Sequence, residues 1–166
     1  WDDSRNKLEE VFARCMGAEA ALVRPQFMSG THTLTVALFG LLRTSDTLLA
    51  ATGRPYDTLE GVIGIGDAGK GCGTLREFGV NYDECPLLPD FTPDYDLIAE
   101  KARTATVVHI QRSRGYTQRN AFDLATIQKV ADTARKANPN AVIFVDNCYG
   151  EFTQTAEPVA FGADIM

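Results

Sequence analysis

The sequence comprises 166 residues, of which 45% are hydrophobic and 23% are charged, a composition typical of a globular chain that buries one sizeable core. Its 22 Asp and Glu residues outnumber its 16 Lys and Arg residues, and the resulting net charge of -6 argues against a nucleic acid as the main partner. No apolar run is long enough to span a bilayer, and no basic and apolar leader opens the sequence, so no membrane association is expected.

The cysteines form no CxxC pair, and no histidine lies near them at the spacing of metal ligands. We therefore expect free, partly buried thiols, no metal site and a cytoplasmic protein. The residues concerned are Cys15, Cys72, Cys85 and Cys148.

The first part of the sequence predicts two helices. Residues 3–16 carry an apolar stripe at helical spacing, from Leu8 to Cys15, and Gly17 follows as a C-cap. After a short apolar stretch at 20–23, the residues Ser29-Gly30-Thr31-His32 open a second apolar segment that continues to Leu42. Its length and its small first residues favour a buried helix.

Apolar strands alternate with helices in the rest of the sequence. Strands are expected at 47–52, 106–111 and 141–145 and, with a weaker signal, at 78–88. Helices are expected at 93–103 and 123–137, and the glycines between 61 and 74 predict a mobile loop. This alternation predicts an α/β fold with a mainly parallel sheet sandwiched by helices. Trp1 is not an initiator methionine and residues 162–166 read as a strand just beginning, so the domain is expected to be truncated.

Three polar clusters fall at strand ends or at a helix start: Ser29-Gly30-Thr31, residues 54–57, and Asp146-Asn147. In parallel α/β folds, ligands bind outside the carboxyl ends of the strands, so these clusters form a candidate site.

Each cluster has more than one interpretation when it is taken alone. Ser29-Gly30-Thr31 suits a phosphate at a helix N-terminus, with Gly30 allowing close approach, or it is an ordinary helix cap. Asp146 could face a pyridine nitrogen and keep the ring protonated, or it could bind a metal or a nucleotide, or cap a turn. Tyr56 could stack on a flat cofactor or be a loop aromatic.

The segment after the strand expected at 106–111 is rich in basic and aromatic residues. Arg112, Arg114 and Tyr116 could bind a substrate carboxylate, although solvated surface arginines are the alternative, most of all for Arg119. His109 lies within a buried strand, where a hydrogen-bonded core histidine is the favoured interpretation. His32, in the first turn of the second helix, could touch a ligand.

Four extended segments carry a family resemblance, in the same order along the chain. They are residues 24–32 (Arg-Pro-Gln, then Ser-Gly-Thr-His), residues 52–60 (Thr-Gly-Arg-Pro-Tyr-Asp-Thr-Leu-Glu), residues 109–116 (His-Ile-Gln-Arg-Ser-Arg-Gly-Tyr) and residues 144–151 (Phe-Val-Asp-Asn-Cys-Tyr-Gly-Glu). Together they resemble the methionine gamma-lyase-related family, also described as cystathionine beta-lyases linked to aluminium resistance.

The resemblance implies the large domain of a fold type I pyridoxal-phosphate enzyme. Residues 1–166 would then be part of the domain that binds pyridoxal 5'-phosphate (PLP), without an N-terminal segment, the Schiff-base lysine region and the small C-terminal domain. It implies that Gly30 and Thr31 bind the phosphate, that Tyr56 stacks on the ring, and that Asp146 meets the pyridine nitrogen. In this family the Schiff-base lysine follows soon after a Gly-Ala-Asp element, which is present here at 162–164, beyond which the sequence ends at Met166.

One segment departs from the wider cystathionine-lyase group, in which a Ser-Asn-Pro element lies near the cofactor. The matching place here reads Ser113-Arg114-Gly115.

The resemblance implies a PLP-dependent carbon–sulfur lyase acting on a sulfur amino acid, by elimination of the cystathionine or methionine type, with Tyr56 assisting the leaving group. The fragment alone is expected to be inactive, and the full-length protein to be a homo-oligomer, a homotetramer by family analogy. Two alternatives keep the fold: other α-carbon chemistry such as transamination, and a non-catalytic protein.

Overall fold

The computed structural model describes residues 3–166 of the chain. The helices are α1 (Asp3–Met16), α2 (Gly30–Leu41), α3 (Asp57–Ile63), α4 (Tyr95–Lys101) and α5 (Leu124–Ala137), together with the 3-10 helices η1 (Ala102–Thr104) and η2 (Pro158–Phe161). The strands are β1 (Thr47–Ala50), β2 (Asn81–Glu84), β3 (Val107–Gln111) and β4 (Val142–Asp146).

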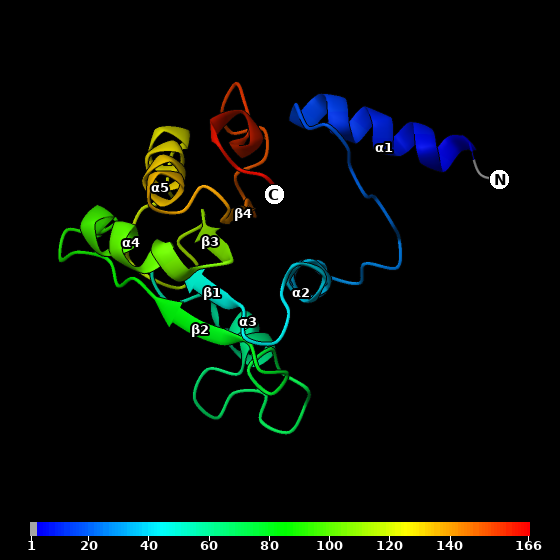
Figure 1. Ribbon diagram of the computed structural model, residues 1–166. Coiled ribbons are helices and arrows are strands. Elements are labelled where there is room, and N and C mark those ends of the chain that lie inside the picture. Colours follow the sequence, from blue (N-terminus) through cyan, green and yellow to red (C-terminus); the bar gives the residue numbers. More distant parts are fainter. Residues whose placement is uncertain (1–2) are drawn as a thin grey trace.

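The strands form one parallel sheet in the order β2-β1-β3-β4 (Figure 1). Helices α2 and α3 cover one face, and α4 and α5 cover the other. Side chains on a strand alternate between the faces, so each strand contributes to both cores: Leu48 packs with the first pair of helices and Leu49 with the second. The predicted α/β sandwich is confirmed.

The chain reverses the direction in which it adds strands after β2. From β1 it passes through α3 to β2 at one edge, and from β2 it passes through α4 to β3 on the other side of β1. The loops that leave β1 and β3 therefore lead to helices on opposite faces. This topological switch point leaves a crevice at the carboxyl ends of the strands, which is where such sheets bind ligands.

The structure corrects the predicted element boundaries in the middle of the chain. Residues 61–63 belong to α3, not to a glycine-rich loop, because Leu59 and Ile63 lie one turn apart and are both buried. The helix ends where Gly64 adopts a φ of 89°, a conformation that glycine reaches without strain. Of the residues 78–88, where a strand is expected from a weaker signal, only Asn81–Glu84 form one, which is β2. At the C-terminus, Ile165 forms a single parallel bridge with Phe144, as expected of a strand that is just beginning.

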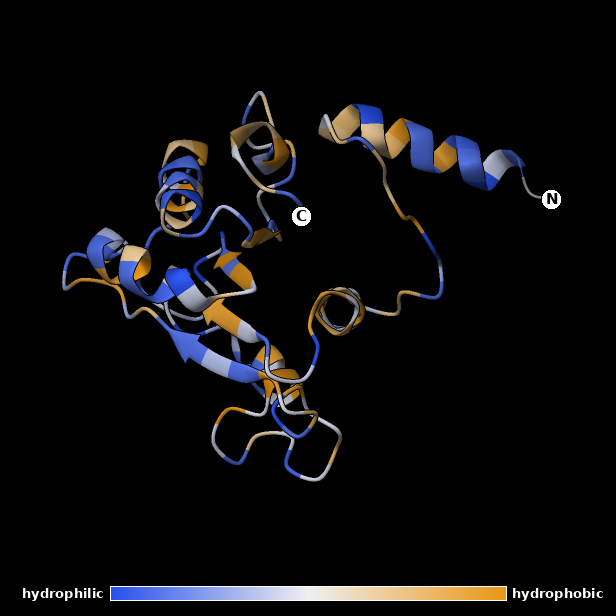
Figure 2. Cartoon of the chain, viewed as in Figure 1, coloured by the Kyte–Doolittle hydropathy of each residue, from blue (hydrophilic) through white to orange (hydrophobic). Residues whose placement is uncertain are grey.

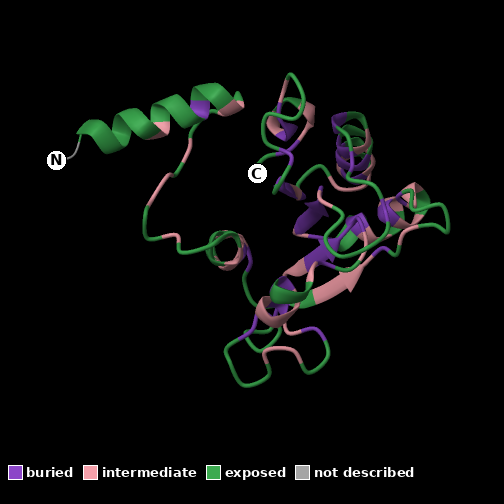
Figure 3. Ribbon diagram, turned by 180° about the vertical axis from the view of Figure 1, so that it is seen from behind, coloured by how far each residue is buried: buried purple, intermediate pink, exposed green. Residues whose placement is uncertain are grey.

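Helix α1 has the predicted bounds, but it lies apart from the sheet at the end of the segment formed by residues 17–29 (Figures 1 and 3). Its apolar stripe is visible in Figure 2, and Leu8, Val11 and Phe12 on it are 44%, 47% and 41% exposed. The described part of the chain therefore does not cover this face. In residues 3–166, no helix combines the length and apolar character needed to cross a bilayer.

Candidate active site

The N-terminus of α2 presents free backbone N–H groups at the predicted anion site. Ser29 is the N-cap, and its side-chain oxygen accepts a hydrogen bond from the backbone N–H of His32 at 3.1 Å. Within residues 3–166, the N–H groups of Gly30 and Thr31 have no acceptor, and a Cβ on Gly30 would meet nothing within 4 Å. The cap and the anion site are therefore compatible. The Ser29 hydroxyl still has a proton to donate, and free N–H groups at a helix start attract anions.

A cluster of hydroxyl groups connects this helix start to the loop after β1. The Thr31 hydroxyl lies 2.5 Å from the Tyr56 hydroxyl and 2.7 Å from that of Thr58. Tyr56 is the residue immediately before α3, so its ring reaches from the switch point to α2. The predicted phosphate and ring-stacking residues are thus brought together.

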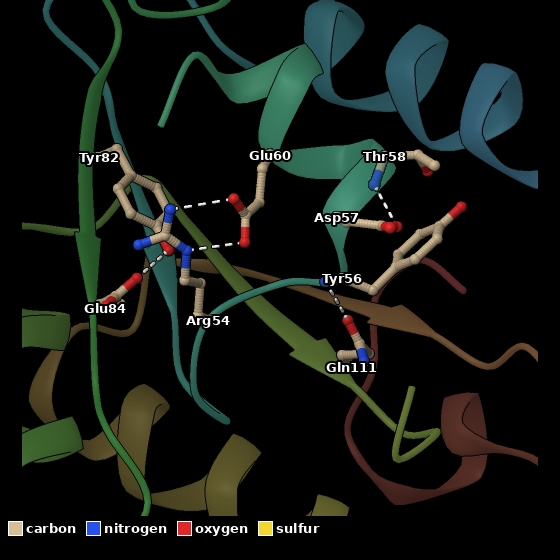
Figure 4. A network of polar contacts seen from close by, with 8 residues as sticks. All are labelled: Arg54, Tyr56, Asp57, Thr58, Glu60, Tyr82, Glu84 and Gln111. Carbon is tan, nitrogen blue, oxygen red and sulfur yellow. Dashed lines mark hydrogen bonds and ion pairs between the residues drawn. The ribbon is translucent and has the colours of Figure 1, made fainter. Parts of the chain in front are cut away.

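Gln111, at the end of β3, holds the backbone of Tyr56 in place. Its side-chain oxygen accepts a hydrogen bond from the Tyr56 N–H at 2.9 Å (Figure 4), and its side-chain nitrogen donates to the Ser113 carbonyl at 3.1 Å. The role of Gln111 is not predicted from the sequence. The available signal was a polar residue at the end of a buried strand, in the position that Asp146 has on β4.

An ion pair braces the same loop from its other side. Arg54 donates from Nε and Nη2 to the two carboxylate oxygens of Glu60, at 2.7 and 2.9 Å (Figure 4). The hydrogen bond with Arg54 lowers the pKa of Glu60 and, reciprocally, raises the pKa of Arg54. The pair joins Arg54, before Tyr56 in the chain, to Glu60 on α3, and so braces the loop that carries Tyr56.

Asp146 ends β4 and is 8% exposed. The register places it opposite Gln111, and its side chain lies on the face covered by α2 and α3. One carboxylate oxygen accepts a hydrogen bond from the Cys148 N–H at 3.1 Å.

These elements enclose a cavity of about 410 Å³, within the usual range for small-molecule sites. Gly30 at the start of α2, Tyr56 after β1, and Asp146 at the end of β4 all line it, as does Tyr116, which is 90% exposed. A neighbouring cavity of about 450 Å³ shares Ser113 and Cys148 with it and is also lined by Arg114. Of the predicted cofactor residues, Gly30, Tyr56 and Asp146 thus line one cavity. Ser29 and Thr31 do not line it but lie at the same helix start, where Thr31 contacts Tyr56. Tyr116 lies on its lining and Arg114 on that of the neighbouring cavity.

Arg112 has a different role from the predicted one. Its side chain is buried, at 4% exposure. Its guanidinium nitrogens donate to the Phe122 carbonyl, the Asn147 side-chain oxygen, the Gly150 carbonyl, the Thr153 hydroxyl and the Gln154 side-chain oxygen. Because a guanidinium has five N–H donors, this arrangement leaves none for a substrate carboxylate. Arg112 instead holds the segment that follows Asp146.

Arg119 is also buried, at 4% exposure, so the favoured interpretation of a solvated surface arginine is wrong. It donates to the carbonyls of Gln111, Arg112 and Ser113, and its charge is covered by the Phe122 ring at 4.2 Å. Burial lowers the pKa of Arg119 to about 10. Arg119 therefore fixes the loop that leaves β3.

His109 is buried, as predicted, with its ring edge-on to Phe144 at a centroid distance of 5.7 Å. Burial lowers the pKa of His109 from 6.5, and the Asp146 carboxylate partly offsets this by raising it. The hydrogen-bonded state expected from the sequence is not complete, because its Nε2 has no partner in the described structure.

The buried imidazole predicts a loss of stability in acid. Below pH 6.5 the unfolded state takes up a proton that the folded imidazole accepts only at lower pH, so stability falls as pH decreases through this window. We expect unfolding by denaturant at about pH 7.5 and about pH 5.5 to show a steeper loss for the wild type than for His109→Gln, by up to about 1.4 kcal/mol per pH unit. Equal slopes for the two proteins would contradict the assignment.

No lysine lines the cavity. Lys101 pairs with Asp83 at 2.6 Å, Lys129 lies over the Tyr95 ring at 3.8 Å, and Lys70 lies in the exposed loop after α3. Lys7 pairs with Glu10 on α1, and Lys136 lies in the last turn of α5. A cofactor that needs a lysine would have to receive it from outside residues 3–166.

Comparison with known proteins places the chain in a family. The family model described as methionine gamma-lyase matches residues 1–166. The chain belongs to the methionine gamma-lyase family. A Bacillus subtilis relative, the uncharacterized protein YnbB, is 45% identical over 166 residues, which cover 99% of this chain and 39% of YnbB.

Solved structures of two relatives superimpose closely. One, from Listeria monocytogenes, is called a "putative cystathionine beta-lyase involved in aluminum resistance"; it is 45% identical with a TM-score of 0.93, over 99% of this chain and 42% of its own. The other, a carbon-sulfur lyase involved in aluminum resistance from Clostridium novyi, is 44% identical with a TM-score of 0.93, over 99% of this chain and 39% of its own. The chain thus spans about two fifths of the length of these relatives.

Proposed function

We propose that the full-length protein is a PLP-dependent carbon–sulfur lyase that acts on sulfur-containing amino acids. The observation that carries this proposal is the arrangement of one cavity, in which a buried carboxylate and a free helix N-terminus both lie at the strand ends. Family membership and the lyase names of two close relatives support it.

The residues present fit the cofactor. PLP has a phosphate at one end and a basic ring nitrogen at the other. The start of α2 offers the N–H groups of Gly30 and Thr31 and the Ser29 hydroxyl to an anion, and Asp146 offers a carboxylate on the same face of the sheet. Tyr56 supplies a flat aromatic wall that its hydroxyl contact with Thr31 keeps in place.

When bound, PLP supplies the electron sink that stabilises negative charge on the α-carbon of the substrate. Asp146 would hold a proton on the ring nitrogen, because a buried carboxylate stabilises an adjacent cation. Tyr56 would orient the ring and lie close enough to assist the departing thiol. Gln111 and Arg112 would keep the loops that carry these groups in position. We place the Schiff-base lysine, which also moves the α-proton, outside residues 3–166.

An assay of the full-length protein with PLP tests this function. Cystathionine and methionine are supplied separately, and free thiol and keto acid are measured. We expect both products from at least one sulfur amino acid. Keto acid formed without thiol would indicate transamination instead, and no thiol from any sulfur amino acid would overturn the lyase assignment.

Thr31→Val is predicted to weaken PLP binding about tenfold, since it removes the hydroxyl that contacts Tyr56 and Thr58 while keeping the shape of the side chain. The matched control is Thr35→Val, because the Thr35 hydroxyl donates only to the backbone of its own helix, at 2.7 Å. Fluorescence titration with PLP checks both variants. Equal affinities for the two would show that the hydroxyl cluster has no part in binding.

We further propose that the full-length protein is a homo-oligomer, which the exposed apolar stripe of α1 supports. Sedimentation of the full-length protein tests this directly, with a single monomeric species as the contrary result.

A further inference from the structure

His109 is a buried polar side chain for which the proposed function has no use. It lies within β3, is 2% exposed, and carries the one enclosed side-chain nitrogen or oxygen in residues 3–166 that lacks a hydrogen-bond partner, Nε2. An unpaired polar group of this kind destabilises a fold. Its presence on the strand next to the one that carries Asp146 therefore needs a reason.

The strand register places Asp146 beside it. His109 pairs with Phe144, and Asp146 is two residues farther along β4, opposite Gln111. Side chains two residues apart on a strand share a face, so His109 and Asp146 are diagonal neighbours on the face covered by α2 and α3. No hydrogen bond joins the two side chains in the described structure, but the Asp146 carboxylate is the charged group that raises the pKa of His109, so the two lie within electrostatic range. The Phe144 ring packs against the imidazole and limits the ways in which it can turn.

The charge states of His109 and Asp146 suit a hydrogen bond from the imidazole to the carboxylate. Desolvation lowers the pKa of His109, so the ring is neutral and carries one N–H donor, while the Asp146 carboxylate is the acidic group that acts on it. In the described structure the carboxylate accepts only the Cys148 N–H, so it retains capacity for further donors. The imidazole has an unused nitrogen, and its diagonal neighbour has unused acceptor capacity.

We propose that His109 is a positioning residue whose ring N–H donates to the Asp146 carboxylate, directly or through one enclosed water, and holds that carboxylate toward the cavity. The proposal rests on the proposed function for the identity of the ligand that Asp146 meets. The histidine–aspartate pair itself does not depend on it.

Nuclear magnetic resonance of the full-length protein without added cofactor tests the pair. With histidine labelled by ¹⁵N, Asp146→Asn is expected to shift the ring nitrogen signals of His109. Asp132→Asn, which changes an exposed carboxylate on α5, is expected to leave them in place. His109 signals that are identical in the wild type and in Asp146→Asn would overturn the proposal.

Two substitutions separate positioning from packing. His109→Phe keeps a ring but has no donor, whereas His109→Gln keeps an N–H close to the place of Nε2. We expect His109→Phe to weaken PLP binding to the full-length protein at least tenfold and His109→Gln to remain within about threefold of wild type. A role in packing alone predicts the reverse order, with Phe tolerated and Gln not. A wild-type protein that binds no PLP would refute the proposed function, while the NMR comparison still decides the pair.

Discussion

Asp146→Asn in the full-length protein is expected to lower kcat/KM for thiol release by about a hundredfold to a thousandfold, the usual loss when one preorganised electrostatic group is removed from an active site. The asparagine fills nearly the same volume and can still accept the Cys148 N–H at the end of β4. It cannot supply the negative charge that keeps a pyridine nitrogen protonated. The loss is therefore expected in turnover far more than in folding.

Steady-state thiol release with saturating PLP measures this effect. Asp132→Asn serves as the control, because it removes the same charge from the exposed side of α5. Activity of Asp146→Asn within about threefold of the control would contradict the assigned role, since a group opposite the ring nitrogen should contribute several kcal/mol to the barrier.

Arg112→Met is expected to lower the free energy of unfolding by about 3–4 kcal/mol, a large value for one substitution. The methionine keeps much of the apolar stem but leaves the Phe122 carbonyl and the Asn147 side-chain oxygen without a donor. The Gly150 carbonyl loses one of its donors and keeps the Thr153 hydroxyl. The fit around the guanidinium is close: a Cβ on Gly150 would lie 2.4 Å from Arg112 Nη1.

Denaturant unfolding of the full-length protein, repeated at several protein concentrations, measures this change in the free energy of unfolding. Arg114→Met is the matched control, because Arg114 lies two residues away on the same loop and is exposed, and we expect it to leave the unfolding midpoint unchanged. Equal midpoints for both variants would show that the Arg112 network does not stabilise the fold.

The long, regular elements could be predicted from sequence because their apolar spacing is unambiguous. In α5 the buried residues Leu124, Ile127, Ala131 and Ala134 recur at helical spacing after the Asp123 cap. Helix α3 could not be predicted in this way. It is seven residues long, and its burial depends on packing against α2 and the sheet.

The site could be predicted in part. Asp146 and the start of α2 were found because polar groups at strand ends and helix starts are local patterns, although the cofactor itself came from the family resemblance. The buried roles of Arg112 and Arg119 could not be seen, because charged side chains are usually exposed and their acceptors here are loop carbonyls. The hydrogen bond from the Tyr56 N–H to the Gln111 side chain likewise depends on β1 and β3, which meet only in the folded sheet.

A crystal structure of the full-length protein with PLP tests the central claim most directly. We expect the phosphate at the N-terminus of α2, within reach of the Gly30 and Thr31 N–H groups, and the ring nitrogen within hydrogen-bonding distance of Asp146. A phosphate bound elsewhere, or a ring nitrogen that does not meet the Asp146 carboxylate, would contradict it.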